Sequence, residues 1–156
     1  MKLALALTLL CLAPAPGARA AASGCWFERG VVVVPAAVAG IAGDYILDTG
    51  SATTQIHETR AQMAGITEAT LSGEVRLAGM RWPDRPVQVV DLDARTYAFP
   101  TPIAGVIGAD MLSGYVVDLA VSPCRVAIWK PGSAPQFRAQ QRLPMDVASE
   151  IGRAHV

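Results

Sequence analysis

Short runs of β-branched and aromatic residues, separated by glycine and proline, dominate the chain from Trp26 onward. Runs of this kind are typical of β-strands, and the glycine and proline residues between them mark turns. The clearest runs are 31–34, 45–47, 87–92, 116–119 and 126–129. Strands of this length and spacing predict an all-β domain, either a small barrel or a sandwich.

Turns and helices fit between these strands. The glycine-containing segment 39–43 marks the turn between the first two strands, which we expect to form a hairpin. Glu58 to Ala64 predicts a short helix after a strand at 53–56, and Gly65 is well placed to end it. Ala109 to Leu112 predicts a second short helix.

The first twenty residues have the composition of a secretion signal. Lys2 supplies a positive charge, Leu3 to Leu12 form a short apolar run, and Ala18-Arg19-Ala20 fits a cleavage site between small residues. The apolar run is too short to remain as a membrane anchor. We therefore interpret residues 1–20 as a signal peptide and expect an exported protein, periplasmic or extracellular, with no integral membrane span.

Removal of the signal would take Cys11 with it and leave Cys25 and Cys124. Two cysteines in an exported protein predict one disulfide. This bridge would close a loop of about a hundred residues and stabilise the fold by roughly 4 kcal/mol in the chain-entropy model. Two alternatives stay open: a pair of unrelated buried thiols, or a lipoprotein in which Cys25 carries the lipid, although Cys25 lies far from the apolar run.

Length and charge limit the remaining function classes. The chain has 156 residues, of which 52% are hydrophobic, and its 13 basic and 13 acidic side chains give no net charge. This composition suits one modest globular domain, which we place at residues 25–130. Without a basic stripe there is no electrostatic reason to expect nucleic acid as a partner.

A carboxylate at the end of an apolar run is the first chemical signal. Ile46-Leu47 is followed by Asp48-Thr49-Gly50-Ser51. An acid at the mouth of a buried strand is partly desolvated, Gly50 lets the backbone turn tightly, and Thr49 offers a hydroxyl to hold the loop. Alone, such a motif is often only a turn at the end of a strand.

A second motif, about sixty residues later, strengthens the interpretation of the first. Val106-Ile107-Gly108, an apolar pair before a glycine, leads into the predicted helix at 109–112. Together the two motifs resemble those of the aspartic protease family, in particular its retropepsin-like lobes and their exported bacterial relatives. The resemblance covers about residues 28 to 130, with both motifs in the family's order.

The resemblance implies a small closed acid-protease-type β-barrel lobe with one or two short helices, in which Val106-Ile107-Gly108 threads beside the Asp48 loop. It also implies half a catalytic site. In this family two such aspartates, one from each lobe, share a proton and activate a water that attacks a peptide bond. Asp48 would be catalytic, supported by Thr49, Gly50 and Ser51, and Thr49 would form a hydrogen bond across the lobe interface. The second aspartate would come from a further lobe or a homodimer partner, the substrate would be a peptide or protein, and no cofactor is expected.

One feature departs from the family pattern. Family members close a glycine-rich flap hairpin over the substrate, but here the candidate turns Ser72-Gly73 and Ala78-Gly79 carry no clear flap signature. If 75–77 and 87–89 form a hairpin of the barrel body, the flap is shortened or absent. The alternative function is a non-catalytic binding or scaffolding domain in the cell envelope.

Other polar residues receive structural interpretations. Asp110 lies at the start of the second predicted helix, where a carboxylate serves the first turn. Asp91 and Asp93 are expected to end a strand. His57 has no partner at metal-ligand spacing, so we predict no metal site.

The C-terminal part suggests a truncated protein. Residues 131–150 are rich in Pro, Gly, Ser and Gln and predict a linker toward a second lobe. The last six residues, 151–156, can be read as the codons ATC-GGA-AGA-GCA-CAC-GTC, a common sequencing-adapter sequence. We therefore expect residues 151–156 to be an artefact and the gene to continue.

Overall fold

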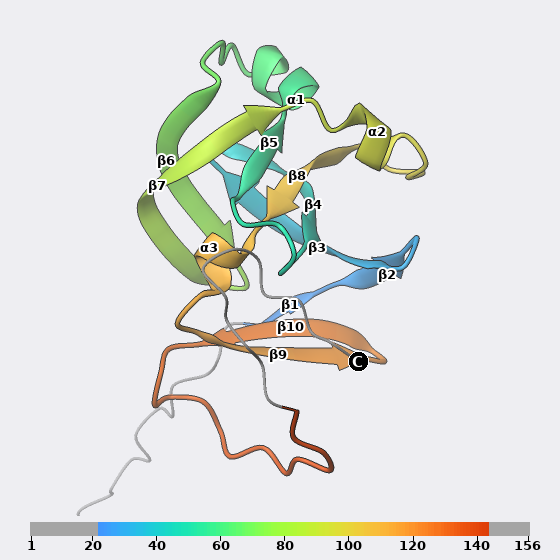
Figure 1. Ribbon diagram of the computed structural model, residues 1–156, viewed down its shortest axis with the longest axis vertical. Coiled ribbons are helices and arrows are strands. Elements are labelled where there is room, and N and C mark those ends of the chain that lie inside the picture. Colours follow the sequence, from blue (N-terminus) through green and yellow to red (C-terminus); the bar gives the residue numbers. More distant parts are fainter. Residues whose placement is uncertain (1–21, 144–156) are drawn as a thin grey trace, which may run out of the picture.

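A β-barrel with a small second sheet beside it forms the protein (Figure 1). The computed structural model describes residues 22–143. The predicted signal peptide at 1–20, the later part of the predicted linker and the predicted artefact at 151–156 lie outside the described residues. Within residues 22–143, no helix is long and apolar enough to cross a membrane.

Six strands close the barrel. They pair in the order β3 (Val31–Val38), β4 (Ile41–Leu47), β8 (Ile103–Ile107), β5 (Gln55–His57), β7 (Met80–Val90) and β6 (Thr70–Leu77), and β6 returns to β3. A further strand, β2 (Trp26–Glu28), pairs with the first half of β3, beside the half that β6 occupies. The predicted all-β class with a small closed barrel is confirmed.

The hairpin between β3 and β4 turns at Ala39 and Gly40, as the sequence predicts. Both residues have positive φ angles, 49° and 84°, which is the backbone of a tight two-residue hairpin turn. The expectation that Ala42-Gly43 belongs to this turn is wrong, because both residues pair with β3 inside β4. Gly43 is needed there for space, since a Cβ atom on it would lie 2.8 Å from the Cβ of Ala104.

Three strands, β1 (Ala22–Gly24), β10 (Cys124–Trp129) and β9 (Val116–Val121), form the second sheet in that order. Val126 and Ile128 of β10 are buried against the barrel core. Leu119 and Val117 lie opposite them on β9 but remain exposed, as does Val121 at the end of the same strand. The sheet therefore extends past the barrel and leaves an apolar edge strand in solvent.

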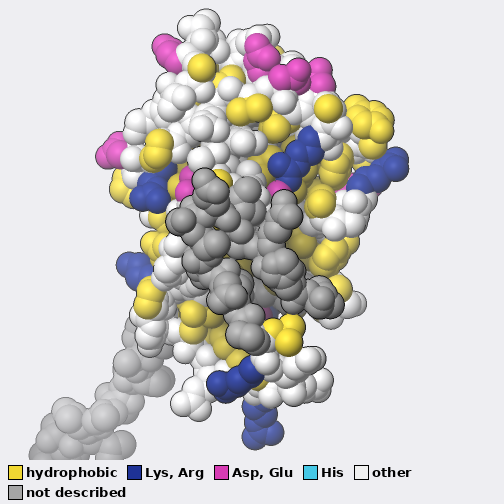
Figure 2. Space-filling view, viewed as in Figure 1, with side chains coloured by type: hydrophobic (Ala, Val, Ile, Leu, Met, Phe, Trp, Pro, Cys, Tyr) yellow, Lys and Arg dark blue, Asp and Glu magenta, His cyan; other side chains and the backbone are white. Residues whose placement is uncertain are grey.

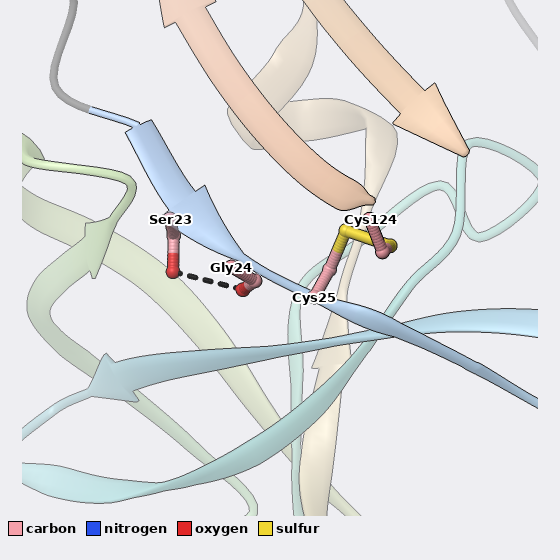
Figure 3. Close-up of a disulfide and its surroundings, with 4 residues drawn as sticks. All are labelled: Ser23, Gly24, Cys25 and Cys124. Carbon is pink, nitrogen blue, oxygen red and sulfur yellow. Dashed lines mark hydrogen bonds between the residues drawn. A yellow bond between two sulfur atoms is a disulfide. The ribbon is translucent and has the colours of Figure 1, made fainter. Parts of the chain in front are cut away.

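A disulfide joins the two sheets (Figure 3). Cys25 lies between β1 and β2, where the chain passes from one sheet to the other, and Cys124 begins β10. The pair spans 99 residues of sequence, which agrees with the predicted bridge. The unrelated-thiol alternative is thereby excluded, and a sulfur already bonded to Cys124 is not available to carry a lipid.

Within the described residues, three short helices accompany the strands: α1 (Glu58–Met63), α2 (Asp93–Thr96) and α3 (Ala109–Leu112). The first and third match the predicted helices, and Gly65 follows α1 with a φ of 77°. The sequence did not predict α2, where Asp93 begins a helical turn instead of ending a strand. The strand expected at 53–56 is shifted to β5, because the backbone N–H of Thr54 donates to the Asp110 carboxylate instead of to a neighbouring strand.

The hairpin of β6 and β7 belongs to the barrel body. Val75 pairs with Trp82, not with 87–89 as expected, and the turn lies at Ala78-Gly79. Because the half of β6 next to this turn also pairs with β3, the hairpin closes the barrel and does not project from it.

Tyr45 on β4 is fully buried in the main core, and its hydroxyl donates to the carbonyl oxygen of Ile41 at 2.8 Å. Burial raises the pKa of the Tyr45 hydroxyl well above its usual range, because the charged phenolate would be desolvated. The folded protein therefore holds this proton at a pH where the unfolded chain releases it.

Replacement of Tyr45 by Phe gives the first prediction. Above about pH 10 the unfolded tyrosine ionises while the folded one does not, so Tyr45 should lower the free energy of unfolding by about 1.4 kcal/mol per pH unit. At neutral pH, Tyr45→Phe should lower the free energy of unfolding by about 1 kcal/mol, because the hydrogen bond is lost. Above about pH 10, the variant should lack the loss of stability with rising pH that Tyr45 causes. Urea unfolding between neutral and alkaline pH measures both effects, with the exposed Tyr97→Phe as control. An equal alkaline slope in wild type and Tyr45→Phe would contradict the prediction.

Candidate functional site

Asp48 directly follows the last residue of β4, at the end of a buried hairpin strand. Its backbone N–H donates to the carbonyl of Ile107 at 3.0 Å, which links Asp48 to the neighbouring strand β8. Its Oδ1 accepts the N–H of Gly50 at 2.8 Å, and its carbonyl accepts the N–H of Ser51 at 3.2 Å. The side chain is therefore fixed at one oxygen and retains 28% of its surface exposed.

The second motif lies against this loop. Strand β8 runs parallel to β4 and antiparallel to β5, so Ile107 and Gly108 arrive beside Asp48. The N–H of Ala109 donates to the carbonyl of Ser51 at 2.8 Å. A Cβ atom on Gly108 would lie 2.6 Å from the backbone of Thr53 and 2.9 Å from the Ser51 carbonyl oxygen, so only glycine fits here. The structure thus brings together the two motifs that the sequence singled out.

A buried polar network joins the two segments on their inner side. Thr54 is fully buried, and its hydroxyl donates to Asp110 Oδ1 at 2.8 Å and accepts the N–H of Gly108 at 3.0 Å. Its backbone N–H donates to Asp110 Oδ2 at 3.0 Å. Asp110 also accepts the N–H of Met111, so its predicted place in the first turn of the helix is correct but incomplete. Sequence reasoning missed Thr54, whose only signal was a hydroxyl residue near the Asp48 loop.

Thr49 and Gly50 are both exposed. Among residues 22–143, no hydrogen bond of the Thr49 hydroxyl is observed. The loop is held instead by Ser51, whose Oγ donates to the Thr53 carbonyl at 3.2 Å, and by Thr54. The expected contribution of the Thr49 hydroxyl to this loop therefore stays a prediction.

Arg95 contacts Asp48 directly, which the sequence did not predict. One guanidinium nitrogen of Arg95, on α2, forms an ion pair with Asp48 Oδ2. The two residues are 47 positions apart, so no local pattern links them. Both oxygens of the candidate catalytic carboxylate are thus occupied, one by a backbone N–H and one by a cation.

No flap covers Asp48 in the part of the chain that the structure describes. The only long hairpin after Asp48 and before β8 is β6–β7, which belongs to the barrel wall. The segment beside the carboxylate is instead α2.

His57 serves the fold. It is buried at the end of β5, where its Nδ1 accepts the N–H of Thr59 at the start of α1, at 3.3 Å. Its Nε2 lies 3.1 Å from Asp93 Oδ1. Within residues 22–143, no group of three metal-binding side chains is found. On the face shown in Figure 2, the visible Lys and Arg side chains lie apart from one another and form no single basic patch.

Comparison with known proteins gives structural similarity only. No protein-family model matches the chain, and no curated protein matches it. A retropepsin-like aspartic protease from Rickettsia conorii is similar in fold, with a TM-score of 0.46 and 14% identity over 69% of this chain and 88% of that one. The retroviral protease-like domain of Ddi1 from Leishmania major is similar with a TM-score of 0.43 and 17% identity, over 70% of this chain and 100% of that one.

Replacement of Thr54 tests the network beneath the site. Thr54→Val keeps the shape but leaves the buried Gly108 N–H without its acceptor and removes one of the two hydrogen bonds to Asp110 Oδ1, so the free energy of unfolding should fall by about 2–3 kcal/mol. Thr54→Ser keeps the hydroxyl, so its free energy of unfolding should fall by less. Thr53→Val is the matched control. Among residues 22–143, the Thr53 hydroxyl donates only to Gln88, in an exposed hydrogen bond, and such changes usually stay within about 0.5 kcal/mol. Urea unfolding of the three variants measures the difference, and similar losses for Thr54→Val and Thr53→Val would contradict the network's importance.

Proposed function

We propose that this domain is one lobe of an aspartic-type endopeptidase, with Asp48 as one of two catalytic carboxylates. The observation that carries the proposal is the position of Asp48 in a loop held by the backbone of β8 on one side and by its own turn on the other. Such a carboxylate is presented in one orientation at the surface. A second carboxylate comes from a further lobe or from a second copy of this chain.

The chemistry follows from two carboxylates that share one proton. The ionised carboxylate accepts a proton from a bound water, whose oxygen attacks the peptide carbonyl, and the protonated one donates its proton to the carbonyl oxygen. Collapse of the tetrahedral intermediate then breaks the C–N bond, and the amine leaves with a proton returned from the pair. Only Asp48 is available for this in the described part of the chain, so a single lobe would not turn over substrate.

The alternative is a binding or scaffolding domain with the same barrel. Two observations favour it: no flap hairpin covers Asp48 among the described residues, and Arg95 occupies one of its oxygens. We expect export to the periplasm or the extracellular space in either case, which the disulfide supports.

Asp48→Asn separates the two functions. If Asp48 takes and gives protons, the substitution should lower hydrolysis of a mixed peptide library at mildly acid pH by about 10²- to 10⁴-fold, as measured by mass spectrometry of the products. Glu74→Gln is the control, because Glu74 is also partly buried and paired with an arginine, Arg81, but lies on the β6–β7 hairpin of the barrel wall. Hydrolysis that survives in Asp48→Asn rules out the catalytic role. Peptide binding without hydrolysis, unchanged in Asp48→Asn, supports the binding domain.

The exposed edge of β9 is the surface on which a second copy would pack. Val117, Leu119 and Val121 are exposed on β9, which pairs only with β10 among residues 22–143, and an unpaired strand edge is prone to pair with another strand. Since the proposed site is incomplete with one carboxylate, a partner must bind somewhere on the lobe, and this apolar edge offers both side-chain burial and strand pairing.

A lysine introduced on the exposed side of β9 should weaken self-association. Leu119→Lys and Val121→Lys should each weaken it by about tenfold or more in sedimentation equilibrium, because an apolar side chain would no longer be buried. Met63→Lys is the control, since Met63 is 76% exposed on α1, away from this edge. A wild-type chain that stays monomeric at every concentration would exclude the second copy and leave a further lobe as the source of the second carboxylate.

A further inference from the structure

The ion pair between Arg95 and Asp48 joins the candidate catalytic loop to α2. Asp48 Oδ1 is already fixed by the Gly50 N–H, so Arg95 takes the other oxygen, Oδ2. Arg95 is therefore the group in the position where a second carboxylate would approach to share a proton.

The backbone of α2, which carries Arg95 beside Asp48, is anchored to the barrel. Leu92, at the start of α2, is buried among Val33, Ile46 and Val106 in the second hydrophobic cluster. Next to it, Asp93 contacts the buried His57. Because the Nδ1 of that histidine accepts a hydrogen bond from Thr59, its neutral form carries the proton on Nε2, which faces Asp93. The backbone of α2 is thus held by one apolar and one polar contact.

The Arg95 side chain is less restrained than its backbone. It keeps 37% of its surface exposed, so the guanidinium has room to leave Asp48 while α2 stays in place. An exposed pair of this kind contributes little to stability. Its position at the site is therefore better explained by an effect on the chemistry of Asp48.

A guanidinium and a shared proton are incompatible at the same carboxylate oxygen. Arginine remains charged at any pH that a folded protein tolerates, so its guanidinium N–H groups remain donors to this oxygen. With Arg95 in place, Oδ2 of Asp48 is occupied, so a second carboxylate cannot reach this oxygen to share a proton with it. We propose that Arg95 is an internal counterion that blocks Asp48 in the separate lobe and leaves it when the second carboxylate joins. This inference rests on the proposed function for its role in catalysis.

Carboxyl labelling of the full chain tests the block without any need for enzyme activity. A water-soluble carbodiimide with glycine ethyl ester converts accessible carboxyl groups to amides, and mass spectrometry gives the rate at each residue. In Arg95→Gln, labelling of Asp48 should be about two- to fivefold faster than in wild type, with Asp118 unchanged. The matched control is Arg125→Gln, which should accelerate Asp118 and leave Asp48 unchanged. Arg95→Lys, which keeps a cation, should stay close to wild type.

Each result decides between specific claims. Labelling of Asp48 at the same rate in wild type and in Arg95→Gln would show that Arg95 does not shield Asp48. This result would overturn the proposal, whatever the hydrolysis data show. Faster labelling together with faster Asp48-dependent hydrolysis supports the block, whereas faster labelling with unchanged hydrolysis overturns it. Faster labelling in a protein that hydrolyses nothing supports the Arg95 contact and counts against the proposed function itself.

Discussion

The close approach of β8 to its neighbours is the constraint on which the rest of the structure depends. This strand lies between β4 and β5, and a Cβ atom on Gly105 would lie only 2.1 Å from the Gln55 carbonyl oxygen. A strand buried on both faces must be apolar throughout, which Ile103–Ile107 is. Because glycine at 105 and 108 lets the backbones approach, β8 reaches the Asp48 loop and its carbonyl can accept the Asp48 N–H.

The close contact between β8 and the Asp48 loop also explains the buried hydrogen bonds of Thr54 and Asp110. Once Gly108 lies against the 51–53 backbone, its own N–H is buried and needs an acceptor, which the Thr54 hydroxyl supplies. That hydroxyl then donates to Asp110, so one side chain satisfies groups on both segments. A helix as short as α3 has little stability of its own, and the Asp110 contacts attach its first turn to the barrel. The candidate catalytic loop is thereby supported from the core side and left open on the outer side.

The sequence predicted the features that local patterns record. Apolar runs and turn residues located most strands, the helices α1 and α3, and the β3–β4 hairpin, and the two motifs located the Asp48 loop and the strand beside it. It misplaced Ala42-Gly43, because a glycine required by the neighbouring Ala104 has the same appearance as a glycine required by a turn. It missed α2, whose single turn is too short for any periodicity, and therefore missed Arg95 as well. Contacts such as Arg95–Asp48 and Thr54–Asp110 join residues far apart in sequence, and only the closed barrel brings them together.

The charges around Asp48 also explain why one barrel suits both of the functions considered. Taken alone, the lobe presents an aspartate paired with Arg95, an arrangement that a binding surface can keep and that, in our proposal, blocks hydrolysis. Under the proposed function, a second carboxylate changes this arrangement, because it must reach Oδ2 of Asp48, the oxygen that Arg95 occupies, to share a proton there. The fold permits Arg95 to withdraw, since α2 is anchored through Leu92 and Asp93 and not through Arg95. Under the proposed function, the difference between a binding domain and a protease lobe would be set by which group, Arg95 or a second carboxylate, occupies Oδ2 of Asp48.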